Sequence, residues 1–469
     1  MTNLNIKELI QIPYSCSPTS SPDNNRVAYL NNVSGTPQVW VLDSDGNHKQ
    51  ITHYEERVAL VSWSPCGKWI LFSIDKGGDE NFQIKIIDST DYSEIKSLTN
   101  DMSVRNDFGG WSNDGKSIVY SSNKRDAAYF DLYVQPIGEE AKLVHKTGEG
   151  VHNVSFLAFS NNKNFILFTE ERTNRYQFLK LLDISNDKVT QISDDNLLGG
   201  FKYAFFNEQD DQITIITNQG KDFSGIAEID ISSKSVKYIY SENHEVEYMK
   251  HDNANDRILF FINDRGYSKL GVLNFVDGSA EIISEPNEVT FMEPGWAWGL
   301  TILDKSNVLF TINSSNQNPE IIKFNLDSHK FDYFNRAYKG DINLNDLPSP
   351  TLHTFKTFDD RDIPFFFIKP DSFVQGGDNP VLILIHGGPE GQERPIFKPQ
   401  IQYLVSQGIG VLLPNVRGSG GYGESYGHLD DKYKRMDSVK DIQYLWNWVV
   451  DTGWASKEKI AVNDSKTSI

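Results

Sequence analysis

Residues 63–72 read Trp-Ser-Pro-Cys-Gly-Lys-Trp-Ile-Leu-Phe, and this phrase recurs along the chain. It returns as Trp-Ser-Asn-Asp-Gly-Lys-Ser-Ile-Val-Tyr at 111–120 and, more loosely, as Phe-Ser-Asn-Asn-Lys-Asn-Phe-Ile-Leu-Phe at 159–168. The spacing of roughly 43 to 52 residues is typical of the four-stranded blades of a β-propeller. An earlier copy begins at Ser21, and degenerate copies begin near Asn207, Asp252 and Asp304.

Each copy follows the same order of segments. A polar turn precedes a β-rich run such as 69–74, a second run such as 83–87 follows, and a short strand ends near Leu98-Thr99. One such sheet cannot bury both of its faces, but a ring of sheets can. The repeats between about Ser21 and Phe334 therefore predict a seven-bladed β-propeller. An irregular β-sandwich is the alternative, and the recurring turn argues against it.

The pattern changes after Gly340. The stretch 345–350, Asn-Asp-Leu-Pro-Ser-Pro, has the prolines of a linker. Beyond it, strands alternate with helical segments, which indicates a mostly parallel sheet with helices on its faces. We expect the apolar strand 381–385 to be buried at the centre of this sheet. The other expected elements are strands at 352–358, 363–368, 410–413 and 460–462, and helices at 397–407 and 436–450.

These patterns divide the chain into four parts. An N-terminal segment covers 1–20, the propeller 21–340, the linker 341–350 and the α/β region 351–469. The α/β region is too short for a complete sheet of the kind that its strands begin. The fold class expected from the sequence is thus a propeller followed by an incomplete α/β domain.

Composition excludes several function classes. The 469 residues carry a formal net charge of −19, which argues against nucleic-acid binding because the phosphate backbone would repel the chain. No apolar stretch approaches the roughly 20 residues that span a bilayer, and the N-terminus has no apolar core of a signal peptide. Two cysteines, Cys16 and Cys66, are expected to stay reduced. Together these features predict a soluble cytoplasmic protein without membrane or nucleic-acid partners.

A glycine motif follows the strand 381–385 directly: His386-Gly387-Gly388-Pro389. Glycines allow a sharp backbone turn and leave the N–H groups unobstructed. Such N–H groups can hold the oxyanion of a tetrahedral intermediate. We therefore interpret Gly387 and Gly388 as candidate oxyanion donors, with a simple tight turn as the alternative.

A second glycine-rich stretch, Asn-Val-Arg-Gly-Ser-Gly-Gly-Tyr-Gly, covers 415–423. It lacks the Lys-Ser/Thr ending of a phosphate-binding loop, so we interpret it as a turn held by Arg417. Asp437 and Asp441 follow, four residues apart and thus on one helix face. They can form a metal or acid pair, but pairing with Lys434 and Lys440, or solvent exposure, is the expected arrangement. No cofactor or metal site is predicted.

This combination of motifs resembles the prolyl oligopeptidase family of serine peptidases, on its acylaminoacyl-peptidase and dipeptidyl-aminopeptidase side. The resemblance implies a propeller that restricts substrates to short peptides and a C-terminal α/β-hydrolase domain with a Ser-Asp-His triad. The stretches that carry it are 386–389, 415–423, Asp437 with Asp441, 459–462, and the propeller segments 75–82 and 122–126.

The resemblance stops where the nucleophile is expected. Similar proteins continue after the strand 460–462 with a glycine-flanked Ser-Tyr-Gly-Gly turn, because the strained nucleophile turn needs small neighbours. Here 463–469 read Asn-Asp-Ser-Lys-Thr-Ser-Ile without glycine, so Ser465 is not expected to act as a nucleophile. His386 and His428 precede the strand and are excluded as the triad base. We expect the chain to end by truncation, a frameshift or an artificial boundary before the triad, and to be inactive alone.

Two further hypotheses remain. Dipeptidyl-aminopeptidase-like relatives use a glutamate pair of the propeller to hold the free α-amino group of a peptide, and Glu170-Glu171 is the candidate pair here. Its alternative is a solvated acidic edge. The second hypothesis replaces catalysis altogether: a non-catalytic propeller that binds peptides or partner proteins. Short peptides are the expected ligands under both hypotheses, and the oligomeric state stays open.

Overall fold

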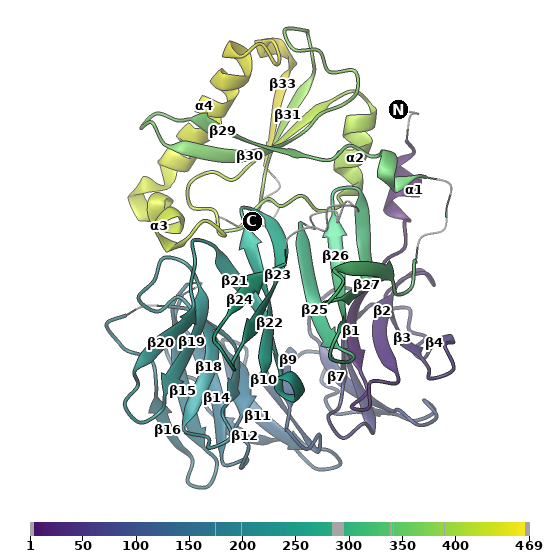
Figure 1. The fold of residues 1–469 in the computed structure, drawn as a ribbon, viewed down its shortest axis with the longest axis vertical. Coiled ribbons are helices and arrows are strands. Elements are labelled where there is room, and N and C mark those ends of the chain that lie inside the picture. The colour runs from purple at the N-terminus through teal and green to yellow at the C-terminus, as the bar shows by residue number, and fades with distance from the viewer. Residues whose placement is uncertain are drawn as a thin grey trace.

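The computed structural model consists of two stacked bodies, a propeller and an α/β region (Figure 1). It describes residues 4–173, 175–197, 199–283, 295–337, 340, 342–388 and 390–464. No helix within these ranges is long and apolar enough to cross a membrane.

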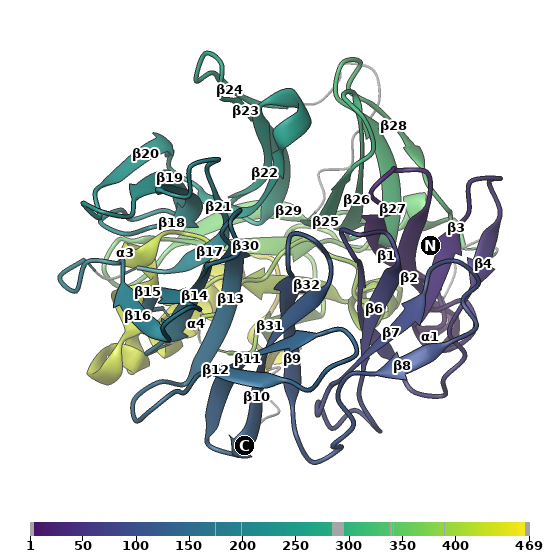
Figure 2. The ribbon, with the colours of Figure 1, turned by 90° about the horizontal axis from the view of Figure 1, so that it is seen from below.

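Seven four-stranded antiparallel sheets form the propeller and surround a common centre (Figure 2). This confirms the predicted seven blades. The strands, blade by blade, are β1 Ser15–Ser20, β2 Val27–Asn31, β3 Gln38–Leu42 and β4 His48–Gln50; β5 Val58–Trp63, β6 Trp69–Ile74, β7 Gln83–Asp88 and β8 Ile95–Ser97; β9 Asn106–Trp111, β10 Ser117–Asp126, β11 Tyr129–Pro136 and β12 Lys142–His145; β13 Asn153–Phe159, β14 Phe165–Glu171, β15 Gln177–Asp183 and β16 Lys188–Gln191; β17 Phe201–Phe206, β18 Gln212–Thr217, β19 Gly225–Asp230 and β20 Val236–Tyr240; β21 Glu245–Asp252, β22 Arg257–Asp264, β23 Tyr267–Asn274 and β24 Ala280–Ile282; β25 Trp296–Ile302, β26 Asn307–Ser314, β27 Gln317–Asn325 and β28 Lys330–Tyr333.

The repeated phrase is the turn between the first and second strands of a blade. Gly67 and Gly115 adopt positive φ angles of 77° and 65° there, which glycine accepts without steric cost. The strand that follows is buried on both faces, since neighbouring blades pack against it; all six residues of β6 are buried. The apolar runs after each turn are therefore the core of the propeller.

The first blade begins earlier than predicted. Strand β1 pairs with β2, so the propeller starts at Ser15 and not at residue 21. The prediction was wrong because the repeat marks the turn after the first strand, and that strand carries only a weak apolar pattern. Blades one and seven share no strand and close the ring by packing and by hydrogen bonds, such as Ser17 N to Thr311 Oγ1 at 2.9 Å and Thr301 Oγ1 to Pro18 O at 2.7 Å.

The α/β region contains one five-stranded sheet in the order β29-β30-β32-β31-β33. Strands β32, β31 and β33 run parallel to one another. Strand β30 runs antiparallel to both of its neighbours, β29 and β32. The fully buried strand is β32; in β31 only Val381 and Ile383 are buried. The bounds are β29 Thr351–Lys356, β30 Asp362–Ile368, β31 Val381–Ile385, β32 Gly410–Pro414 and β33 Ile460–Asp464.

Two helices cover opposite faces of this sheet. Leu445 and Val449 of α4 (Arg435–Asp451) pack with Phe365 and its neighbours, whereas Ile401 and Val405 of α2 (Pro399–Ser406) pack with Phe366. Alternate residues of β30 thus serve the two faces, as the two-residue period of a strand requires. The remaining helical elements are short: α1 Ile6–Ile10, α3 Glu424–Gly427, and the 3-10 turns η1 Asn253–Asn255, η2 Leu344–Asp346, η3 His428–Asp430, η4 Lys432–Lys434 and η5 Lys457–Lys459.

The predicted N-terminal segment and linker are parts of the core. Leu9 of α1 packs with Leu344, Leu347 and Phe397, and each of these side chains is buried. The described part of the segment 1–20 therefore divides between the α/β region and the first blade. Two buried leucines and the partly buried Ile342 explain why the polar stretch 341–350 is packed and not a free linker.

Candidate active site

The candidate site lies at one edge of the α/β sheet, beside the propeller. The carboxyl ends of the parallel strands β31, β32 and β33 meet at this edge, which faces the propeller (Figure 1). Ile385 pairs with Asp464, so β33 ends next to the glycine motif that follows β31. Pro389 and Ser465 lie outside the described residues.

The glycine motif after β31 presents two backbone donors. Gly388 has a φ of 59°, a conformation that favours glycine, and Gly391 N donates to Gly388 O at 2.9 Å to close the turn. Among the described residues, neither Gly387 N nor Gly388 N has a hydrogen-bond partner. Unpartnered backbone N–H groups at a strand end are the kind of donor that an oxyanion hole uses.

His386 ties this motif to the glycine-rich turn after β32. Its Nε2 lies 2.9 Å from Ser419 Oγ, and Ser419 Oγ donates to Val416 O at 2.6 Å. Because the serine hydroxyl has one proton, His386 Nε2 must be the donor to Ser419. Burial lowers the pKa of His386, which favours this neutral form. Gly420 N also donates to Gly391 O at 3.0 Å, so the two glycine motifs hold each other.

Arg417 anchors the glycine-rich turn, and its partners correct the prediction for Asp441. Its guanidinium binds Asp441 through two hydrogen bonds of 2.9 Å each and also binds Asp359 at 3.0 and 3.2 Å. Asp441 is fully buried and is neither solvated nor paired with Lys434; Asp437 does pair with Lys440, at 2.7 Å. Burial alone would lower the pKa of Arg417, but the hydrogen bonds to Asp441 and Asp359 raise it.

A second serine motif was missed in the sequence analysis. Residues 423–427 read Gly-Glu-Ser-Tyr-Gly, which fits the Gly-x-Ser-x-Gly pattern of a nucleophile turn. Ser425 does not follow a strand, however, and its Oγ donates to Asp222 Oδ2 at 2.9 Å. His428 contacts Asp431 at 2.7 Å and Tyr176 OH at 2.8 Å, and no hydrogen bond joins it to Ser425. These residues therefore dock the two bodies and do not form a triad.

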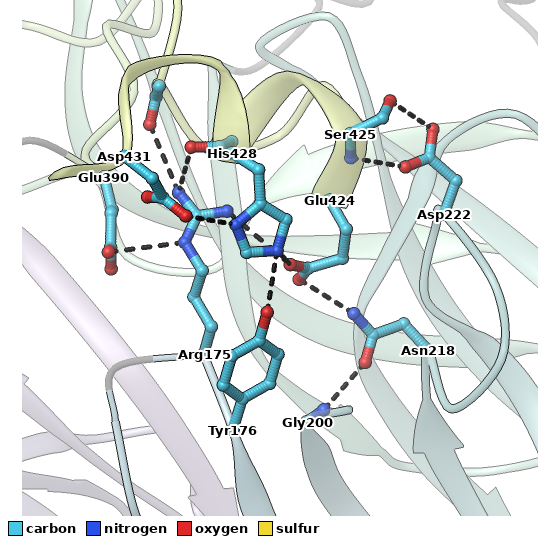
Figure 3. Close-up of polar contacts among 12 residues, drawn as sticks. Arg175, Tyr176, Gly200, Asn218, Asp222, Glu390, Glu424, Ser425, His428 and Asp431 are labelled. Atoms are coloured by element: carbon cyan, nitrogen blue, oxygen red, sulfur yellow. Dashed lines mark hydrogen bonds and ion pairs between the residues drawn. The ribbon is translucent and has the colours of Figure 1, made fainter. Parts of the chain in front are cut away.

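Propeller loops contact this segment closely (Figure 3). Arg175 lies between Glu390 and Glu424, with N–O distances of 3.3 and 3.6 Å, and Asn218 Nδ2 donates to Glu424 Oε1 at 2.8 Å. A second anchor is Arg394, which binds Glu247 of β21 through bonds of 2.8 and 2.9 Å. Sequence reasoning missed these contacts because they join residues more than a hundred positions apart.

Two cavities lie between the bodies at this edge. Their volumes are about 260 and 330 Å³, and both are lined by Glu247, Glu390, Gly420 and Gly421. Glu245 lines the first cavity and accepts hydrogen bonds from Ser224 N and Oγ. Burial raises the pKa of Glu245. The cavity walls are thus rich in carboxylates, and Glu390, two residues after Gly388, lines both cavities.

Comparison with known proteins agrees with this architecture. A family model described as the TolB β-propeller domain matches residues 11–197, and one described as the prolyl oligopeptidase family matches residues 395–463. Prolyl oligopeptidase ophP of Omphalotus olearius is 22% identical over 437 residues, which cover 85% of this chain and 57% of that protein. The α/β region and the relatives that match most of the chain are thus similar to the prolyl oligopeptidase family.

A further curated relative and two solved structures show the same extent of similarity. Dipeptidyl peptidase family member 6 of Caenorhabditis elegans is 21% identical, with 97% of this chain and 66% of that protein covered. A prolyl endopeptidase structure superposes with a TM-score of 0.82 at 14% identity, over 98% of this chain and 69% of its own. A puromycin hydrolase structure gives a TM-score of 0.80 at 14% identity, over 99% and 76%. The chain spans about three fifths of the length of the first curated relatives that it matches.

The glutamate pair suggested by the family resemblance is not a pair in space. Adjacent residues of β14 point to opposite faces, so Glu170 and Glu171 diverge. Glu170 is buried and binds Lys180 Nζ at 2.6 Å and His145 Nε2 at 2.8 Å, which links blades four and three. Burial raises the pKa of Glu171. Recognition of a free α-amino group by these residues is a hypothesis from the sequence, and peptide binding by the double variant tests it.

Proposed function

We propose that this chain supplies the propeller and the oxyanion-binding part of a serine peptidase that hydrolyses short peptides. The observation that carries the proposal is the pair of unpartnered N–H groups of Gly387 and Gly388, which follow β31 at the carboxyl edge of the sheet; Glu390, two residues after Gly388, lines both cavities between the two bodies. In acyl transfer, such donors stabilise the oxygen that gains charge when a nucleophile attacks the carbonyl.

The position of the site supports a preference for short peptides. Both cavities are bounded by the propeller and the α/β region together, and each holds only a few hundred cubic ångströms. A bound segment must therefore be narrow and extended, since a folded protein does not fit between the two bodies. The names of the curated relatives, which are oligopeptidases and peptidases, agree with peptide substrates.

No described residue offers a nucleophilic serine to this site. Ser419 lies beside His386 but is fully buried, and its hydroxyl donates to Val416 O. Ser425 donates to Asp222. We therefore propose that the 469-residue chain does not hydrolyse peptides. The test uses purified chain with aminoacyl- and acylaminoacyl-p-nitroanilides and a fluorophosphonate probe: we expect neither turnover nor labelling, and labelling that disappears in Ser465→Ala would refute inactivity.

Binding tests the positive part of the proposal. A short peptide should slow hydrogen exchange at residues 386–391 when it is added to the whole chain, because its carbonyl groups approach the free N–H groups. Gly388→Ala should weaken this binding. The matched control is Gly376→Ala, because both glycines have positive φ and open space where a Cβ atom would lie, but Gly376 lies away from the site. Equal binding by both variants would contradict the role of Gly388.

One observation favours the non-catalytic alternative. A larger cavity of about 770 Å³ opens among the ends of the inner strands β9, β13, β17 and β21, on the side of the repeated turns. Aromatic side chains line it, including Trp111, Phe156, Phe205, His251 and Phe275. If peptides bind there, their addition protects residues 204–209 from exchange and leaves 386–391 unchanged.

A further inference from the structure

We propose that Arg175, on the turn between β14 and β15 of the propeller, positions the oxyanion loop of the α/β region. The oxyanion loop is defined here by the described residues of 386–391, which are 386–388, 390 and 391. This inference rests on the proposed function, since it concerns the same two donors. It adds that the propeller does more than restrict access: one of its side chains holds the loop that carries the donors.

The guanidinium of Arg175 is inserted into the α/β region (Figure 3). Only 13% of its side chain is exposed. Nη2 donates to Gly427 O at 3.0 Å and to Gly418 O at 3.4 Å. Glu390 and Glu424 provide two carboxylates at 3.3 and 3.6 Å, so the buried positive charge has negative partners. A buried and paired arginine holds its partners more strictly than an exposed one.

The contacts of Arg175 reach both glycine motifs. Glu390 belongs to the oxyanion loop and lies two residues after Gly388. Gly418 precedes Ser419, which binds His386 at the other end of that loop at 2.9 Å. One propeller side chain therefore contacts the loop directly at Glu390 and indirectly through the turn that holds His386. Loss of Arg175 would free both supports together.

The space around the guanidinium indicates that the α/β region is shaped to receive it. A Cβ atom at position 427 would lie 1.7 Å from Arg175 Nη1, so only glycine leaves room for the arginine there. The φ of Gly427 is −59°, an ordinary helical value, so the backbone conformation does not itself demand glycine. The small residue is explained by the close approach of Arg175.

The test measures hydrogen exchange by mass spectrometry on the whole chain. For Arg175→Met we expect exchange of the hydrogen-bonded amides within 386–391 and 418–427, such as Gly391 and Gly420, to become at least about ten times faster, which corresponds to about 1.4 kcal/mol of local stability. Arg175→Lys should restore part of the protection, because its ammonium reaches a carboxylate but cannot donate to both carbonyls. The matched control is Arg172→Met: Arg172 lies on the same turn and contacts propeller groups, donating to Gly150 O at 3.1 Å.

Three outcomes would overturn the proposal. The first is unchanged exchange at 386–391 in Arg175→Met. The second is the same acceleration in Arg172→Met, which would make it an effect on the fourth blade. The third is equal acceleration at 263–268, next to the Arg394 anchor, which would indicate separation of the two bodies. None of these outcomes depends on peptide binding. The proposed function fails in a different way: the loop is ordered in the wild type, but added peptide does not slow its hydrogen exchange. The two failures are therefore distinguishable.

Discussion

Glu170→Gln should destabilise the propeller more than any neighbouring substitution of a charged residue. The carboxylate of Glu170 is 5% exposed and joins Lys180 of its own blade to His145 of the preceding blade. Glutamine keeps the shape but removes the negative charge, which leaves the partly buried cationic partner Lys180 without its counter-ion. Breaking one half of a buried ion pair is strongly destabilising.

The magnitude follows from the pKa of this carboxyl group. Burial opposes ionisation, but the hydrogen bonds from His145 and Lys180 outweigh it and lower the pKa of Glu170 from 4.5 to about 2. A lowering of that size corresponds to about 3 kcal/mol of folding free energy at neutral pH. Because the folded-state pKa is the lower one, this contribution is fully present above pH 4.5 and is lost as the pH falls toward 2. The difference between wild type and Glu170→Gln should therefore shrink across that window.

Native-state hydrogen exchange of residues 165–171, measured between pH 7 and pH 4, checks this expectation, with urea unfolding of the whole chain at lower pH. Glu171→Gln is the matched control: burial raises the pKa of Glu171, so its charge does not stabilise the fold and its removal should cost nothing. A Glu170→Gln variant as stable as the control at pH 7, or a difference that persists undiminished at pH 2, would refute the reasoning.

Three further predictions follow from the described contacts. Arg417→Lys should lower the free energy of unfolding of the α/β region in urea by about 3 kcal/mol, because lysine cannot form the paired bonds to buried Asp441. The control Arg361→Lys alters an exposed pair with Asp359 at 3.9 Å and should change this free energy by less than about 1 kcal/mol. Equal losses in the two variants would contradict the prediction. Gly427→Ala should displace Arg175 and speed hydrogen exchange at residues 418–427. The control Gly148→Ala adds a methyl group that meets nothing within 4 Å, so it should leave this exchange unchanged. Similar exchange in the two variants would show that the interface adapts to the methyl group at position 427. Lys180 and His145 already bind the carboxylate of Glu170. We therefore expect the double variant Glu170→Gln/Glu171→Gln to bind a free-amine peptide and its N-acetylated form with the same ratio of affinities as the wild type in titration calorimetry. A selective loss of free-amine binding would instead identify the two glutamates as the amine site.

The propeller was predictable because its signal is local and repeated. The turn at Gly67 and the apolar run of β6 lie within a dozen residues, and their recurrence reports the blade, the blade count and the buried strand. The strands and helices of the α/β region were predicted to within a few residues because their apolar patterns are also local, although they are not repeated. Where no repeat marks an element, as for β1, the sequence placed the boundary one strand too late.

By itself, the sequence determined the seven blades, the strand before Gly387 and Gly388, and the family resemblance, because periodicity, glycine turns and motif spacing are properties of neighbouring residues. Only the tertiary structure decided the partners of the charged groups. Asp441 binds Arg417, Glu170 binds Lys180 and His145, and Arg175 reaches Glu390 across more than two hundred residues of chain. The physical reason is that the effect of a charge depends on its burial and on which opposite charge lies within a few ångströms, and both are set by how the blades and the sheet pack together.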